Sequence, residues 1–168
     1  MAPVDYQFNV AQLLRDPVGS ERRFVLNGTE LAEPGWLSLT RIPGGVLARA
    51  RLLLRTTAAC SRCLREFATT TTVAFEEVYY QRVDVVTGEQ LERPDDPDAF
   101  LVSTVHTVDI SEAVRQYTEM AAAMQPLCRP DCPGLCPVCG QDLQAGDCGC
   151  DREATDPRWA ALAALKLD

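Results

Sequence analysis

The chain has 168 residues, 46% of them hydrophobic and 24% charged, which is typical of a folded globular protein. Its net charge of −8 disfavours a general nucleic-acid coat protein. No apolar run reaches the roughly 20 residues of a membrane span, and no signal-type segment opens the sequence, so we expect a cytoplasmic protein.

The first two predicted strands occupy residues 22–31 and 35–42. Both segments combine apolar and β-branched residues over a strand-like length. The turn-prone sequence Glu33-Pro34-Gly35 separates them, and a second turn is expected at Pro43-Gly44-Gly45.

The next two predicted strands form a hairpin. Residues 46–59 alternate between small or apolar side chains and polar ones, which predicts a half-buried strand. Residues 67–83 are rich in Thr, Val and aromatic residues, as strands are. The short connector predicts an antiparallel hairpin with Cys60 and Cys63 at its tip.

The strand at 46–59 carries a basic face. Residues 1–60 have a net charge of +2 and residues 61–168 one of −10, yet six arginines and no acidic residue lie from Arg41 to Arg65. Such a local patch can contact phosphate although the whole chain is acidic. The candidate nucleic-acid-binding residues are Arg49, Arg51, Arg55, Arg62 and Arg65.

A solvated acidic loop is expected at residues 84–99, followed by a helix from Ile110 to Met124. Asp109 and Glu112 have the spacing of a capping box at its start. The Met and Tyr residues of this helix are expected in the core.

A second helix is predicted from Pro157 to Leu167, because Asp156 followed by proline is a strong helix start. A helix this short needs docking to be ordered. Its apolar residues are expected either on the protein's own domain or on a partner. These candidate docking residues are Trp159, Leu162 and Leu165.

Together these elements predict an α+β protein: an antiparallel β-sheet or partly closed barrel with a helix, a Cys-rich zinc-knuckle module and a C-terminal helix. We expect a β-rich domain at 1–125, a zinc-binding module at 126–152 and a docking helix at 153–168.

Six of the eight cysteines fall within residues 127–150. A reducing cytoplasm disfavours a disulfide framework. The segment Cys136-Pro137-Val138-Cys139-Gly140 favours metal ligation, because glycine after the second cysteine permits the left-handed backbone of a knuckle. Zinc is the favoured metal; iron and free structural thiols are the alternatives.

Eight cysteines divide naturally into two tetrahedral sites of four ligands. Closing the chain between Cys63 and Cys128 costs roughly 4 kcal/mol, whereas a structural zinc supplies about 10–16 kcal/mol. We therefore predict two zinc ions; pairing Cys60 and Cys63 with Cys136 and Cys139 is the alternative partition. The predicted ligand sets are Cys60/Cys63/Cys128/Cys132 and Cys136/Cys139/Cys148/Cys150.

Catalytic arrangements fit the sequence less well. The single histidine, His106, gives no basis for a Ser/His/Asp set and lacks the His-x-Glu pattern of zinc deaminases. A site of four cysteines is closed, whereas a catalytic zinc keeps an open position. No catalytic residue is predicted.

Three ordered blocks from about Cys60 to the C-terminus carry a family resemblance: CSRCLREF, then PLCRPDCPGLCPVCGQDL with CGC, and finally DPRWAALAALK. Together they resemble the large ribosomal RNA subunit accumulation protein family (YceD-like). The resemblance implies a non-enzymatic ribosome-biogenesis factor needed for large-subunit (23S) rRNA accumulation and processing.

The resemblance also implies association with large-subunit pre-rRNA, direct or indirect, and with a small basic large-subunit ribosomal protein. It adds no small-molecule substrate and no membrane. Two other functions fit the residues: a thiol/zinc redox-responsive regulator and a zinc-ribbon nucleic-acid-binding protein. Zinc content and cysteine accessibility distinguish the first of them.

Overall fold

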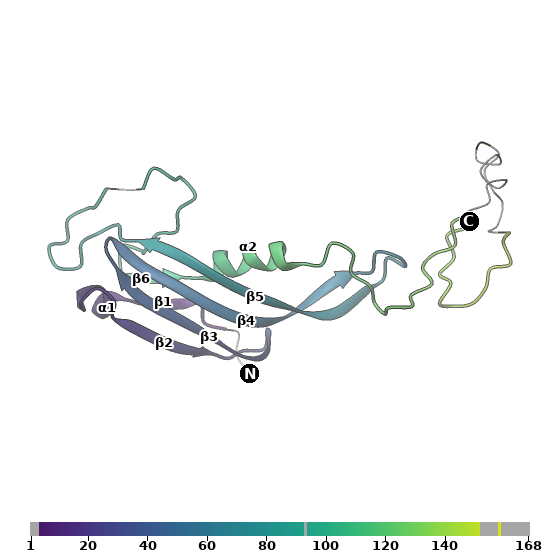
Figure 1. Ribbon diagram of the computed structural model, residues 1–168, viewed down its shortest axis with the longest axis horizontal. Coiled ribbons are helices and arrows are strands. Elements are labelled where there is room, and N and C mark those ends of the chain that lie inside the picture. Colours follow the sequence, from purple (N-terminus) through teal and green to yellow (C-terminus); the bar gives the residue numbers. More distant parts are fainter. Residues whose placement is uncertain (1–3, 93, 152–157, 159–168) are drawn as a thin grey trace, which may run out of the picture. The chain divides into compact units, whose positions relative to one another are not determined.

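The computed structural model describes residues 4–92, 94–151 and 158 (Figure 1). They form two compact units. The β unit consists of the described residues within Met1–Thr57 and Ala68–Met124. The cysteine unit consists of those within Ala58–Phe67 and Gln125–Asp168. The tip of the predicted hairpin therefore groups with the Cys-rich segment.

The strands are antiparallel and form two sheets (Figure 1). The larger has the order β2-β3-β4-β5, with β2 and β5 at its edges, so it is open and not a partly closed barrel. The smaller pairs β1 with β6. The α+β class is confirmed. The strands are β1 Gln7–Asn9, β2 Glu21–Leu26, β3 Leu31–Ile42, β4 Gly45–Ala59, β5 Glu66–Tyr80 and β6 Thr107–Asp109.

The turn between β2 and β3 lies earlier than predicted. It falls at residues 27–30, where the amide N of Leu31 donates to the carbonyl of Gly28 at 3.2 Å. Glu33 and Pro34 lie inside β3, where the register with β4 shifts twice. Proline lacks an N–H, and a bulge accommodates that loss without ending the strand.

The core of the β unit lies on one face of the larger sheet. Strand β4 alternates as predicted, with Ala48, Ala50 and Leu52 buried. Two helices contribute to the same cluster: α1 Ala11–Arg15, which the sequence pattern did not predict, and α2 Ser111–Ala121. The other face of β2, β3 and β4 carries exposed side chains, as is common in antiparallel sheets.

Helix α2 is shorter than predicted and packs by its first turns. Tyr117 lies 5.4 Å from Phe75 between ring centroids. Met120 and Met124 are 77% and 98% exposed, so their prediction as core residues is wrong. Met120 lies in the last turn of α2 and Met124 lies beyond its end, so the packed surface ends before both positions.

The capping box at the start of α2 does not form as a reciprocal pair. The Asp109 carboxylate accepts the amide of Ser111 at 2.9 Å. The Glu112 carboxylate instead accepts hydrogen bonds from Arg115 and Gln116, one turn further along.

No described helix combines the length and the apolar surface that a membrane crossing requires. The acidic segment predicted at 84–99 contains no named helix or strand in its described residues. The predicted C-terminal helix lies outside the described residues, apart from Arg158.

Candidate metal centres

The hairpin tip between β4 and β5 forms a knuckle at residues 60–65. The amide of Leu64 donates to the carbonyl of Cys60 at 2.9 Å, and the amide of Cys60 donates to the carbonyl of Arg65 at 2.9 Å. These bonds close a tight loop, which directs the cysteines at its first and fourth positions toward the same side.

Residues 136–141 repeat this hydrogen-bond pattern. The amide of Gly140 donates to the carbonyl of Cys136 at 2.9 Å, and the amide of Cys136 donates to the carbonyl of Gln141 at 2.8 Å. The amide of Val138 also lies 3.4 Å from the Cys136 Sγ atom, to which it donates. The two C-x-x-C segments are therefore equivalent local structures.

The first knuckle meets two cysteines from the later segment. The Sγ atoms of Cys60 and Cys132 lie 3.8 Å apart, and those of Cys63 and Cys128 also lie 3.8 Å apart. Three of the four side chains are buried, and Cys128 is half-buried. The structure thus brings together the four cysteines of the first predicted set.

The second knuckle meets the two cysteines of the CGC segment. In each group of four, the Sγ atoms all lie within 4.8 Å of one another. Cys136 is buried, Cys148 and Cys150 are half-buried, and Cys139 is exposed. The two groups have the predicted partition, not the alternative one.

The sulfur spacing fits a tetrahedral metal. Zinc binds thiolate at about 2.3 Å, which places two sulfurs of a tetrahedron about 3.8 Å apart. A disulfide would require roughly 2.05 Å, and none of the eight cysteines is in a disulfide. Four thiolates and no open position make each group suited to a structural metal.

Backbone amides favour a thiolate at the first cysteine of each knuckle. Amides of Cys128 and Cys63 lower the pKa of Cys60 to about 6. Amides of Cys139 and Val138 lower the pKa of Cys136 to about 6. These N–H donors stabilise the ionised sulfur, which is the form that ligates metal.

Another thiol in each group shifts the opposite way. Burial raises the pKa of Cys132 to about 12. Hydrogen bonding with Cys139 and Cys148 raises the pKa of Cys150 to about 12. Thiols packed this closely ionise together only when a cation neutralises them, so a divalent metal suits these groups.

Neighbouring side chains hold the first group in place. Arg62 donates to the carbonyl of Cys132 at 2.9 Å, and Arg65 forms an ion pair with Asp142 at 2.5 Å. The side-chain Nε2 atom of Gln144 lies 3.5 Å from the Cys132 Sγ atom and donates to it. Sequence reasoning missed Gln144, because a glutamine in a Gly-rich loop carries no distinguishing signal.

The remaining predicted arginines lie on the exposed face of β4. Arg49 forms a two-pronged ion pair with Glu76, at 2.7 and 3.1 Å. The Arg55 Nε atom donates to the carbonyl of Leu31 at 3.2 Å. Arg49, Arg51 and Arg55 therefore share one face, whereas Arg62 and Arg65 belong to the cysteine unit. The predicted docking residues Trp159, Leu162 and Leu165 lie outside the described residues.

Comparison with known proteins identifies relatives in bacteria and in a plant. An uncharacterised protein of Mycobacterium tuberculosis (strain H37Rv) is 32% identical over 156 residues, covering 90% of this chain and 72% of the relative. An uncharacterised protein of Mycobacterium leprae is 27% identical over 129 residues, covering 75% and 55%. No solved structure matches the chain.

A third relative is the large ribosomal RNA subunit accumulation protein YCED homolog 1, chloroplastic, of Arabidopsis thaliana. It is 31% identical over 62 residues, which are 37% of this chain and 19% of the relative. The family model for large ribosomal RNA subunit accumulation protein YceD matches residues 49–166, a range that contains all eight cysteines. This chain therefore belongs to the YceD family of large ribosomal RNA subunit accumulation proteins.

Proposed function

We propose that this protein is a non-enzymatic ribosome-biogenesis factor that supports the accumulation of large-subunit rRNA. The family match over residues 49–166 carries this proposal. Two groups of four cysteines within that range support a structural role for metal, because a closed set of thiolates leaves no position for a substrate.

We infer that zinc occupies both groups. Four thiolates in tetrahedral spacing suit zinc, and iron is the alternative metal for the same ligands. In the first group zinc would join the hairpin tip to the later segment, in which Cys128 lies 65 residues after Cys63 and Cys132 lies 72 residues after Cys60. The binding energy of zinc would thus stabilise the fold of the cysteine unit.

The partners we propose are large-subunit pre-rRNA and a small basic large-subunit ribosomal protein. Their support is the charge distribution: residues 61–168 carry a net charge of −10, and the outward face of β4 carries arginines. An acidic surface attracts a basic ribosomal protein and shields it from other anions.

A genetic experiment tests this function. Deletion of the gene is expected to lower the ratio of large-subunit to small-subunit rRNA, and the wild-type gene should restore it. A Cys60→Ser/Cys63→Ser variant is expected to fail. Ser61→Ala is the matched control within the same knuckle, since its hydroxyl donates to the carbonyl of Pro126 and to no other group in the described part of the chain. An unchanged rRNA ratio after deletion would refute the proposal.

The exposure of Cys139 favours one second candidate, a redox-responsive regulator. Peroxide accepts two electrons from a pair of thiolates, which become a disulfide while the metal leaves and the peroxide becomes water. If this were the function, mild peroxide should release one zinc and change rRNA levels reversibly. Zinc release without an effect on rRNA levels would refute the redox-regulator candidate and leave the biogenesis factor as the proposed function.

A further inference from the structure

The outward face of the larger sheet carries a half-exposed tryptophan, which no helix or strand of the described residues covers. Trp36, on β3, is 47% exposed, and Val25 beside it on β2 is 71% exposed. The neighbouring residue Leu37 points to the opposite face and is fully buried. A half-exposed tryptophan on an ordered strand presents a rigid aromatic surface at a fixed place.

Arginines surround this tryptophan in register. Trp36 pairs with Val25 on one side and with Arg51 on the other. One step along the same face, Ser38 pairs with Arg23 and Arg49. Side chains directly opposite on neighbouring strands have Cβ atoms about 4.5–5.5 Å apart, so the Arg51 side chain can reach the indole.

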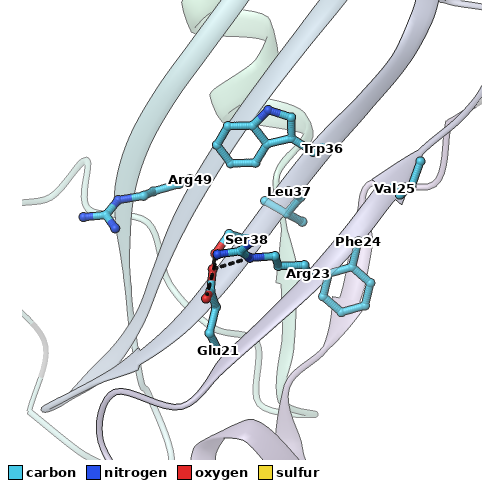
Figure 2. A pocket seen from close by; sticks show the side chains of 8 residues that line it. All are labelled: Glu21, Arg23, Phe24, Val25, Trp36, Leu37, Ser38 and Arg49. Atoms are coloured by element: carbon cyan, nitrogen blue, oxygen red, sulfur yellow. Dashed lines mark hydrogen bonds and ion pairs between the residues drawn. The ribbon is translucent and has the colours of Figure 1, made fainter.

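Two hollows of the surface border Trp36. A hollow of about 560 Å³ is lined by Trp36, Arg23 and Arg49 together with residues of β2 and β3 (Figure 2). A second hollow of about 230 Å³ is lined by Trp36, Arg51 and Thr72 with the β3 bulge. Trp36 borders both hollows, so a flat group could lie against its ring.

The charges on this face leave guanidinium groups available. Glu21 accepts hydrogen bonds from Arg23 and Ser38 (Figure 2). Arg49 forms an ion pair with Glu76. Glu33 borders the smaller hollow. Within the described residues, neither Arg51 nor Arg55 has a carboxylate at ion-pair distance.

We propose that this face binds single-stranded RNA, with a base stacked on Trp36 and phosphates contacted by Arg51 and Arg55. Every base has a π-face, so one exposed tryptophan beside guanidinium groups that have no carboxylate partner among the described residues accepts unpaired nucleotides of any sequence. An acidic peptide would use the arginines but gain nothing specific from the indole. The inference rests on the proposed function, to which it adds a direct RNA contact.

Binding of a fluorescein-labelled oligouridylate of about 12 nucleotides, a length within known single-strand site sizes, tests the proposal. Trp36→Ala in the full chain should weaken binding by about 5- to 150-fold, the range measured for single stacked bases. Trp36→Phe should retain part of the affinity. Arg51→Gln/Arg55→Gln should reduce the salt dependence, by about 0.7 in the log–log slope for each phosphate that is no longer neutralised.

Arg15→Gln is the matched control, since Arg15 lies on α1 and, among the described residues, its guanidinium donates only to the carbonyl of Val85. It removes the same kind of charge and should change neither affinity nor slope by a comparable amount. A stacking readout comes from Trp159→Phe, which leaves Trp36 as the single tryptophan of the sequence. Its fluorescence should be quenched by the oligouridylate and not by poly-L-glutamate.

Several results would overturn the inference. One is unchanged binding of the oligouridylate by Trp36→Ala. Another is quenching of the Trp36 fluorescence by poly-L-glutamate to the same extent as by the oligouridylate. A third is a dimer that buries Trp36 and binds RNA at another surface. The two proposals fail separately. Loss of RNA binding in Trp36→Ala without any rRNA defect in the deletion strain would refute the function alone. A deletion defect together with normal RNA binding by Trp36→Ala would refute this inference alone.

Discussion

Leu64 and Gly140 occupy the same position in the two knuckles. Each follows the second cysteine of a C-x-x-C, each donates its amide to the carbonyl of the first cysteine, and their φ angles are 61° and 75°. Glycine adopts this left-handed conformation without strain, whereas a branched side chain does not. The first knuckle therefore holds strain that the second avoids.

Leu64→Gly is expected to stabilise the first knuckle. Leu64 is 67% exposed, so little packing is removed, and the left-handed conformation costs leucine about 1–2 kcal/mol. Hydrogen exchange of the amides in residues 60–65 should slow, by up to about tenfold per 1.4 kcal/mol. Gly140→Ala should accelerate exchange in 136–141. Faster exchange in Leu64→Gly would show that the leucine side chain makes a stabilising contact.

Two zinc ions per chain are expected by elemental analysis of protein purified under reducing conditions. Cys60→Ser and Cys136→Ser should each lower the content by one, because the two groups share no ligand. Ser61→Ala should retain both ions. A variant that lost both ions after one substitution would show that the groups depend on each other, and iron in place of zinc would correct the metal.

The two ions should leave at different rates in excess chelator. The second group contains the exposed Cys139, whereas three ligands of the first group are buried. A chelator reaches an exposed sulfur more readily, so a fast and a slow phase are expected in a colorimetric release assay. The fast phase should be missing in Cys136→Ser. Its persistence there would place the labile metal at the first group.

Zinc binding should release fewer than four protons per ion at pH 7. The pKa values of Cys60 and Cys136 lie at about 6, so these two sulfurs are mostly ionised before metal arrives. Because their pKa values are lowered, this advantage exists above pH 6 and is lost as the pH falls through it. Zinc affinity should therefore decline more steeply below about pH 6. Calorimetry in buffers of different ionisation enthalpy measures the protons, and a count of four would contradict the thiolates.

Trp159→Ala is expected to have one of two distinguishable effects. If the predicted helix docks on its own protein, the melting temperature should fall, since loss of a buried tryptophan typically costs about 3–5 kcal/mol. If it docks on the ribosomal partner, stability should be normal while co-purification of that partner is lost. A variant that alters neither property would refute docking by this residue.

Much of the fold follows from local patterns in the sequence. The alternation of Ala48, Ala50 and Leu52 with arginines predicts β4 and its buried face, because side chains of a strand alternate between faces. The segment Cys136-Pro137-Val138-Cys139-Gly140 predicts the second knuckle. The cysteine count predicts two groups of four, but the sequence leaves open which cysteines join the hairpin tip. The tertiary structure brings Cys128 and Cys132 to Cys60 and Cys63.

Other features depend on contacts between distant segments. Pro34 reads as a turn residue, yet pairing with β4 keeps it inside β3 as a bulge. Met120 and Met124 continue a helical stripe, but only packing decides where the covered surface ends. Gln144 reaches the Cys132 sulfur through the fold of its loop. Trp36 meets Arg51 only because β3 and β4 pair in this register. Periodicity determines which residues share a face, whereas tertiary packing determines which face is covered and which distant groups meet.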